Sequence, residues 1–113
     1  MLMKFLIRLL AAALCLSTAA AYAAGSVNNV TIIRIAADNL GHLFFYFSGP
    51  IGGTPPGCAT VTTGMVVDGT TAGGKVLVGA IMEWYLAGKP VSGTGTGACT
   101  LVTGFENASS FTS

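Results

Sequence analysis

The stretch GGKVLVGAIMEWYLAG, residues 73–88, decides the fold that this sequence predicts. On a helical wheel at about 100° per residue, its polar or small residues Lys75, Gly79 and Glu83 share one side. The opposite arc is apolar and holds Leu77, Val78, Ala80, Ile81, Trp84 and Tyr85. This two-sided pattern is typical of a helix that packs on a core. The apolar run is about a dozen residues and includes Glu83, so it is shorter than the roughly 20 residues that cross a bilayer.

The residues around this stretch give it a start and an end. Asp68, Thr70 and Thr71 can each accept a hydrogen bond from the first free N–H groups of a helix. Gly88 suits the left-handed conformation that ends many helices, and Pro90 cannot continue one. We therefore predict a helix over about 73–88.

The first 23 residues have the pattern of a secretory signal peptide. Lys4 and Arg8 form a short basic start, Leu9–Leu16 is apolar, and Ala21–Ala23 (AYA) fits the small-residue cleavage site. The alternative is a membrane anchor that is retained. We predict cleavage after Ala23, which leaves residues 24–113 as one small domain that is secreted or periplasmic and has no contact with the membrane.

The charges of the mature chain exclude one class of partner. Residues 24–113 carry three cations against four carboxylates: Arg34, Lys75 and Lys89, and Asp38, Asp68, Glu83 and Glu106. Proteins that bind nucleic acids draw much of their affinity from Lys and Arg on phosphates. So few cations argue against a nucleic-acid partner.

Two cysteines remain after the predicted cleavage, because Cys15 leaves with the signal peptide. Cys58 and Cys99 form an even pair in an oxidising compartment, so we predict a disulfide that stabilises the domain by about 3–4 kcal/mol. A zinc site would need more ligands than these two cysteines and the one histidine, His42, supply. We expect no metal and no cofactor.

Short strands are predicted on both sides of the helix, because β-branched and aromatic runs alternate with Gly, Pro, Asn and Asp turns. The runs are Val27–Ala37, His42–Ser48, Cys58–Val67, Pro90–Ser92 and Ala98–Phe111, with loops at Gly49–Gly57 and Gly93–Gly97. In the last run, Ala98–Thr103 and Gly104–Phe111 make up one strand or two. Three strands, a helix and two more strands are the order of the five-stranded barrel called the OB-fold. The fold class is therefore mainly β with one helix, and a general α+β sheet with one packed helix is the alternative.

The second half of the chain resembles known secreted proteins. Three segments are similar to those of small secreted bacterial proteins with one disulfide: Gly74-Lys75 at the start of the helix, Ala87–Val91 (AGKPV) at its end, and Gly95–Cys99 (GTGAC). The same features are distantly similar to the OB-fold binding subunits of bacterial toxins such as subtilase cytotoxin. The resemblance covers Cys58 onward and implies a secreted OB-like barrel with a glycan-binding role. In the first half, where the glycan-contact residues of those subunits lie, no residue matches.

Catalytic patterns are weak in this sequence. Asp38 and His42 can be combined with a serine into a triad, but the two residues flank a predicted turn, where a surface histidine is the simpler interpretation. Asp68 suits a turn or helix cap, Glu83 lies on the polar helix face, and Glu106 falls in a polar stretch. No carboxylate pair has a spacing that indicates acid–base chemistry. We expect no enzyme, and a small hydrolase is the alternative.

One strand carries the only positive indication of function. In His42–Ser48, alternation sends Phe45 and Phe47 to one face and Phe44 and Tyr46 to the other. We expect one pair to be core and the other, Phe44 and Tyr46, to contact a ligand or partner. We therefore predict a non-catalytic binding module for a glycan or another protein. The alternative is a structural or assembly subunit that forms homo-oligomers through this aromatic strand.

Overall fold

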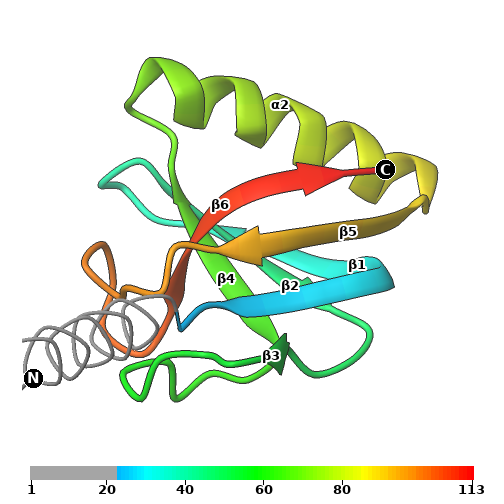
Figure 1. The fold of residues 1–113 in the computed structure, drawn as a ribbon. Coiled ribbons are helices and arrows are strands. Elements are labelled where there is room, and N and C mark those ends of the chain that lie inside the picture. The colour runs from blue at the N-terminus through cyan, green and yellow to red at the C-terminus, as the bar shows by residue number, and fades with distance from the viewer. Residues whose placement is uncertain (1–22) are drawn as a thin grey trace, which may run out of the picture.

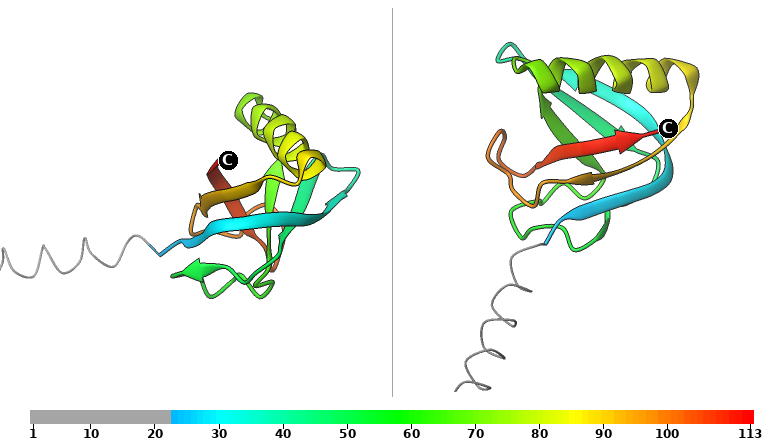
Figure 2. Two further views of the ribbon diagram at one scale, coloured as in Figure 1. Left: turned by 90° about the vertical axis from the view of Figure 1, so that its right-hand side faces the viewer. Right: turned by 45° about the horizontal axis from the view of Figure 1, so that its top comes forward.

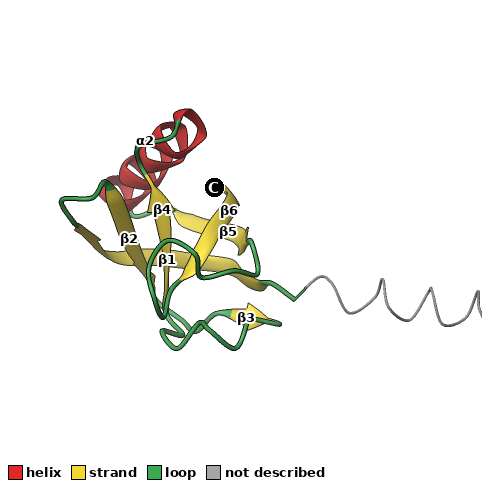
Figure 3. Cartoon of the chain, turned by 90° about the vertical axis from the view of Figure 1, so that its left-hand side faces the viewer, coloured by secondary structure: helices red, strands yellow, loops and turns green. Residues whose placement is uncertain are grey.

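The computed structural model describes residues 23–113, so the predicted signal peptide at 1–23 lies outside the described residues except for Ala23. Within this range the elements are β1 (Gly25–Ala37), β2 (His42–Phe47), β3 (Gly52–Gly53), β4 (Gly64–Asp68), α2 (Ala72–Ala87), β5 (Pro90–Gly95) and β6 (Glu106–Thr112). Helix α2 lies at one end of the sheet and the short strand β3 at the other (Figures 1 and 3). The predicted mainly β class with one helix is confirmed.

Strand β1 is long and bulged, and it is shared between two main neighbours, while its first two residues, Gly25 and Ser26, also pair with β3. Its first part pairs antiparallel with β5 and its second part with β2. The register shifts between Val27 and Val30, and again between Ile32 and Arg34. Such bulges bend a strand and increase its twist, so β1 can turn from one neighbour to the other. Asn29 lies in the first bulge with φ of 53°.

The sheet is only partly closed between β4 and β6. Strand β2 pairs antiparallel with β4, and β5 with β6, but β4 and β6 are parallel and share two residue pairs, Met65 with Glu106 and Val66 with Asn107. Beyond Asn107, β6 follows β5, while β4 ends at Asp68 and turns toward the helix. Of the predicted five-stranded barrel, the structure shows the mainly β sheet and the one helix but not a closed barrel, because β4 and β6 overlap too little to close it.

Helix α2 begins and ends at signals that the sequence shows. The Gly74 N–H donates to Oγ1 of Thr71, one of the three predicted caps, at 2.9 Å. At the other end Gly88 has φ of 64°, and its N–H donates to the Tyr85 carbonyl while the Lys89 N–H donates to the Trp84 carbonyl. This left-handed cap favours glycine, as predicted. The helix starts and stops one residue earlier than predicted.

The core lies between α2 and the inner faces of the strands. Its buried members are Val27, Ile32, Leu43, Phe45, Phe47, Met65, Val67, Ile81 and Val91. The predicted alternation along β2 is confirmed, because Phe45 and Phe47 are buried inside while Phe44 and Tyr46 face outward. From β6, Phe111 completes the aromatic packing, with ring centroids 5.2 Å from Phe45 and 5.9 Å from Phe47. Each fully buried side chain of the core contributes roughly 1.5–3 kcal/mol to the free energy of folding.

Several strand boundaries differ from the predicted ones. Residues 58–63 form a loop, and β4 begins at Gly64 instead of Cys58. A short strand, β3, lies in the predicted loop at 49–57, and 98–103 is a loop instead of a strand. Gly93 and Gly95 belong to β5 and not to a flexible turn. The reason is close packing, since a Cβ at Gly93 would collide with the Phe111 ring and one at Gly95 with the Glu106 carboxylate.

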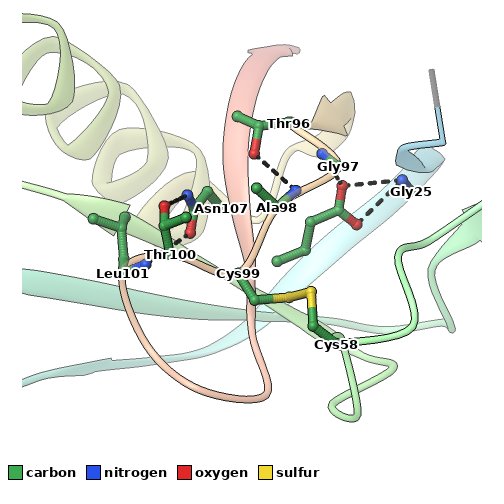
Figure 4. Close-up of a disulfide and its surroundings, with 10 residues drawn as sticks. Gly25, Cys58, Thr96, Gly97, Ala98, Cys99, Thr100, Leu101 and Asn107 are labelled. Atoms are coloured by element: carbon green, nitrogen blue, oxygen red, sulfur yellow. Dashed lines mark hydrogen bonds between the residues drawn. A yellow bond between two sulfur atoms is a disulfide. The ribbon is translucent and has the colours of Figure 1, made fainter. Parts of the chain in front are cut away.

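Cys58 and Cys99 form the predicted disulfide, with Cα atoms 6.1 Å apart (Figure 4). The disulfide joins the loop before β4 to the loop before β6. Beside it, the Val61 N–H donates to the Gly104 carbonyl at 2.9 Å. The two loops are therefore held together both covalently and by backbone pairing.

Candidate functional site

The predicted pair Phe44 and Tyr46 lies on the outer face of β2, and both side chains are half-buried. Phe105 stands edge-on to both rings, with centroids 4.9 Å from Phe44 and 6.1 Å from Tyr46. The Arg34 guanidinium lies over the Tyr46 ring at 5.0 Å from its centroid, a cation–π contact. We refer to Arg34, Phe44, Tyr46 and Phe105 as the outer aromatic cluster.

A buried valine shows that this cluster is also a small second core. Val66 on β4 lies directly opposite Phe44, so the two side chains share the outer face. Val66 is 0% exposed although it does not belong to the main core. Phe105 comes from the loop that Cys99 anchors, so the disulfide supports the cover of this face. Phe44 and Tyr46 therefore contribute to packing, and only part of each ring faces solvent.

A groove of about 580 Å³ lies between α2 and the end of β6. Figure 2 shows α2 above β6 in both views. The apolar side chains that line it are Val67, Val76, Leu77, Ala80, Trp84, Leu101, Ala108 and Phe111, and the polar ones are Asp68, Thr71, Thr96, Asn107, Ser109 and Ser110. The groove exists because β4 and β6 separate after two residue pairs, which leaves an opening beneath the helix.

The rim and the wall of the groove differ in exposure. Val76 at the rim is 75% exposed, and Ser109 and Ser110 on β6 are exposed as well. Trp84 is half-buried and packs against the core, so its indole is fixed in the wall. A rigid aromatic wall with adaptable hydroxyl groups at the rim is typical of ligand pockets.

Asp68 is the only charged side chain in the lining. Its Oδ1 accepts hydrogen bonds from the Thr70 hydroxyl at 2.6 Å and from the Thr70 N–H at 2.9 Å. These bonds, the hydroxyl first, hold the pKa of Asp68 below its ordinary value, so the group is a carboxylate at neutral pH. The side chain of Asn107, in contrast, already forms hydrogen bonds within the protein. Its amide nitrogen donates to the Thr100 hydroxyl at 2.7 Å, and its amide oxygen accepts from the Leu101 N–H.

The structure brings Asp38 and His42 together, but in a structural role. His42 Nδ1 lies 2.7 Å from Asp38 Oδ2, while Asp38 Oδ1 accepts from the backbone N–H groups of Leu40 and His42. These bonds close the turn between β1 and β2, as an Asp at the start of a turn commonly does. The hydrogen bond from the His42 N–H is the main cause that lowers the pKa of Asp38. Asp38 and His42 therefore stabilise the turn through hydrogen bonds.

Two further features concern metal and membrane. Within residues 23–113, no three His, Cys, Asp or Glu side chains gather in a way that would hold a metal ion. In the same range, no helix is both long enough and apolar enough to cross a membrane.

Sequence reasoning located Phe44 and Tyr46 of the outer aromatic cluster but missed Arg34, Phe105 and the groove. The groove depends on where β4 and β6 separate, and those strands are far apart in the chain. One signal was present in the sequence, since Val76 belongs neither to the apolar arc of the helix nor to its polar side. Comparison with protein-family models, with curated proteins and with solved structures found no match.

Proposed function

We propose that this protein is an exported, non-catalytic binding module that holds a glycan in the groove between α2 and β6. The observation that carries the proposal is the lining of the groove, in which an indole and aliphatic wall faces serine hydroxyls and one carboxylate. A sugar ring has C–H groups on its faces and hydroxyls around its edge. The faces match the Trp84 wall, and the hydroxyls match Ser109, Ser110 and Asp68.

The size and charge of the groove agree with such a ligand. A volume of about 580 Å³ lies within the range of roughly 300–1,000 Å³ of small-molecule sites. With Asp68 as its only charge, the lining favours neutral, hydrogen-bonding molecules over phosphates or other anions, which the carboxylate would repel.

Export is supported by two observations. The N-terminal sequence has the pattern of a signal peptide, and the Cys58–Cys99 disulfide is of the kind that persists in oxidising compartments. The strand order supports the finer fold proposal, an OB-fold barrel that is open between β4 and β6. Pairings run from β1 through β2, β4, β6 and β5 back to β1, and α2 follows the third of these strands in chain order. Partly open barrels are a known form of this fold.

Two exposed residues of α2 provide a matched test. Val76 is 75% exposed and lines the groove, while Leu86 is 78% exposed on the same helix and outside the lining. Val76→Arg should place a long cation in the mouth of the groove without disturbing the core, and Leu86→Arg should add the same charge elsewhere. The purified protein is first applied to a panel of immobilised glycans, and the affinity of both variants for the best binder is then measured.

We expect Val76→Arg to weaken glycan binding by tenfold or more and Leu86→Arg to leave it within about twofold. Equal binding by both variants would exclude the groove as the site. Failure of the unmodified protein to bind any glycan of the panel would contradict the glycan assignment.

A second candidate function, assembly through the outer aromatic cluster, is favoured by one observation. Arg34 is exposed and lies over the partly exposed ring of Tyr46. Arg and Tyr are enriched in protein–protein interfaces. Light scattering after gel filtration at micromolar concentration distinguishes the two candidates. Assembly requires an oligomer that dissociates when Arg34 and Tyr46 are both changed to Ala, whereas a solitary binding module remains a monomer.

A further inference from the structure

A carboxylate is buried at the start of β6. Glu106 is 0% exposed, although the sequence placed it in a polar stretch. Its Oε1 accepts from the Gly25 N–H at 3.1 Å, and its Oε2 accepts from the Gly25 and Gly97 N–H groups, each at 3.0 Å. Both oxygens of the carboxyl group therefore accept hydrogen bonds from backbone N–H groups.

Glycines shape the space around this carboxylate. A Cβ at Gly25 or Gly95 would collide with the Glu106 carboxyl oxygens. Gly97 has φ of 82°, and a Cβ there would collide with the carbonyl oxygen of Ala23. The chain from 23 to 25 therefore passes directly beside the carboxylate, at the point where the signal peptide is predicted to be removed.

No side chain on the surrounding elements neutralises Glu106. Strands β3 and β5 carry no charged residue, Arg34 on β1 lies over Tyr46, and Asp68 on β4 bonds Thr70. Within residues 23–113 the only close pair of opposite charges is His42 with Asp38. A buried carboxylate without a cation is costly even when it accepts several hydrogen bonds.

Cleavage after Ala23 would create the missing positive charge in the right place. The α-nitrogen of Ala24 is separated from the Gly25 nitrogen by bonds of about 1.5, 1.5 and 1.3 Å, so the two nitrogens lie within roughly 4 Å of each other. The Gly25 nitrogen itself is 3.0 Å from Glu106 Oε2. An α-ammonium group at Ala24 would thus lie within roughly 7 Å of the buried carboxylate, with only the Gly25 N–H between them along the chain.

We propose that Glu106 is the counter-ion of the α-ammonium group that signal-peptide removal creates at Ala24. Processing then completes an ion pair at the junction of β1, β5 and β6. The inference rests on the proposed export and is independent of what the groove binds. Because the carboxylate stabilises the charged form of the amine, the pair raises the pKa of that α-amino group above its ordinary value.

The test uses the full chain, expressed with its own leader in a bacterial host, and the processed product purified from the cell envelope. Mass spectrometry gives its first residue. The product is then treated with acetic anhydride over a range of pH, and the labelling rate of the α-amine is followed by peptide mass spectrometry. The ε-amines of Lys75 and Lys89, both exposed, are internal controls in the same molecule.

We expect the product to begin at Ala24 and its α-amine to react about fivefold more slowly near pH 8 than that of Glu106→Gln, because an ordinary α-amine is about half uncharged at this pH and the ion pair keeps most of it charged. A second variant keeps Glu106 and inserts one alanine between Ala23 and Ala24, which moves the amine one residue away and should restore fast labelling. The second variant remains informative if Glu106→Gln does not fold.

Equal labelling rates in the unmodified protein and in the insertion variant would overturn the proposal. A product that begins at another residue would also overturn it, since the ammonium group would then be elsewhere. Glycan binding by the groove, measured with Val76→Arg, is unaffected by either result, so failure of this inference and failure of the proposed function are distinguishable.

Discussion

The two faces of strand β2 are both aromatic, yet they are built in different ways. On the inner face, Phe45 and Phe47 are 0% and 2% exposed and are enclosed by residues from β6 and α2. On the outer face, Phe44 and Tyr46 are half-buried under Phe105, which comes from a single loop held by the disulfide. The inner face therefore depends on the whole fold, whereas the outer face depends on one cross-linked loop.

The largest effect that tests this difference is a pair of alanine substitutions. Phe45→Ala should lower the free energy of unfolding by about 3–5 kcal/mol, because it leaves a cavity in the enclosed core. Phe44→Ala should lower it by about 1–2 kcal/mol, since its ring is already partly in water and its surroundings can adjust. Urea unfolding of both variants gives the values. Equal losses would show that the two faces are equivalent.

Removal of the disulfide should affect the outer face of β2 much more than the inner face. Cys58→Ser together with Cys99→Ser should destabilise the protein by about 2–4 kcal/mol. Hydrogen exchange should increase most in the loops at 54–63 and 96–105, because the disulfide joins these two loops and Phe105 of the second covers the outer face, and least in the inner residues of β2. Treating the unmodified protein with a reductant is the matched control. A uniform increase over all strands would contradict a local role for the cross-link.

Two substitutions of Tyr46 distinguish the contribution of its ring to stability from that of its hydroxyl. Tyr46→Phe keeps the contacts with Phe105 and Arg34 and should change the free energy of unfolding by less than about 0.5 kcal/mol. Tyr46→Ala should cost about 1–2 kcal/mol and leave a folded protein with an unchanged near-ultraviolet spectrum from Trp84. A molten Tyr46→Ala variant would mean that the outer aromatic cluster is as essential as the inner core.

The smallest effect is the pH dependence of stability at the edge of the outer face. There the His42 ring lies edge-on to the Phe44 ring, with ring centroids 6.5 Å apart. The hydrogen bond from the His42 N–H lowers the pKa of Asp38 in the folded state. It therefore stabilises the fold at pH values above the pKa of Asp38 in the unfolded chain, about 4. This stabilisation is lost as the pH falls through the lower pKa that Asp38 has in the folded protein. Asp38→Asn should therefore flatten part of the decrease in unfolding free energy below about pH 4. Asp68 has a pKa lowered in the same direction, so some decrease remains. An unchanged pH profile would contradict this role.

Local signals made some of these features predictable. Thr71 and Gly88 mark the ends of α2 within one residue, and alternation assigns Phe45 and Phe44 to opposite faces of β2. The Cys58–Cys99 disulfide follows from the count of cysteines. Each of these inferences needs only neighbouring residues or the compartment, which a single sequence contains.

The remaining features depend on which distant segments meet. The opening between β4 and β6, and with it the groove, follows from a two-residue overlap of strands that a helix and another strand separate. Gly93 and Gly95 were interpreted as turn residues, because the sequence does not show that Phe111 and Glu106 lie against them. Glu106 was assigned to a polar stretch because its N–H partners, Gly25 and Gly97, are contributed by other parts of the fold.

The position of β6 in the chain also has a consequence for production of the protein. Strand β6 follows all the other described strands and pairs with both β4 and β5. Until it is synthesised and docked, β4 and β5 each present an edge with unpaired backbone groups, and such edges recruit strands from other chains. A growing chain that lacks residues 106–112 is therefore open to aggregation at two edges. The yield of soluble protein should depend on how quickly this segment reaches its place.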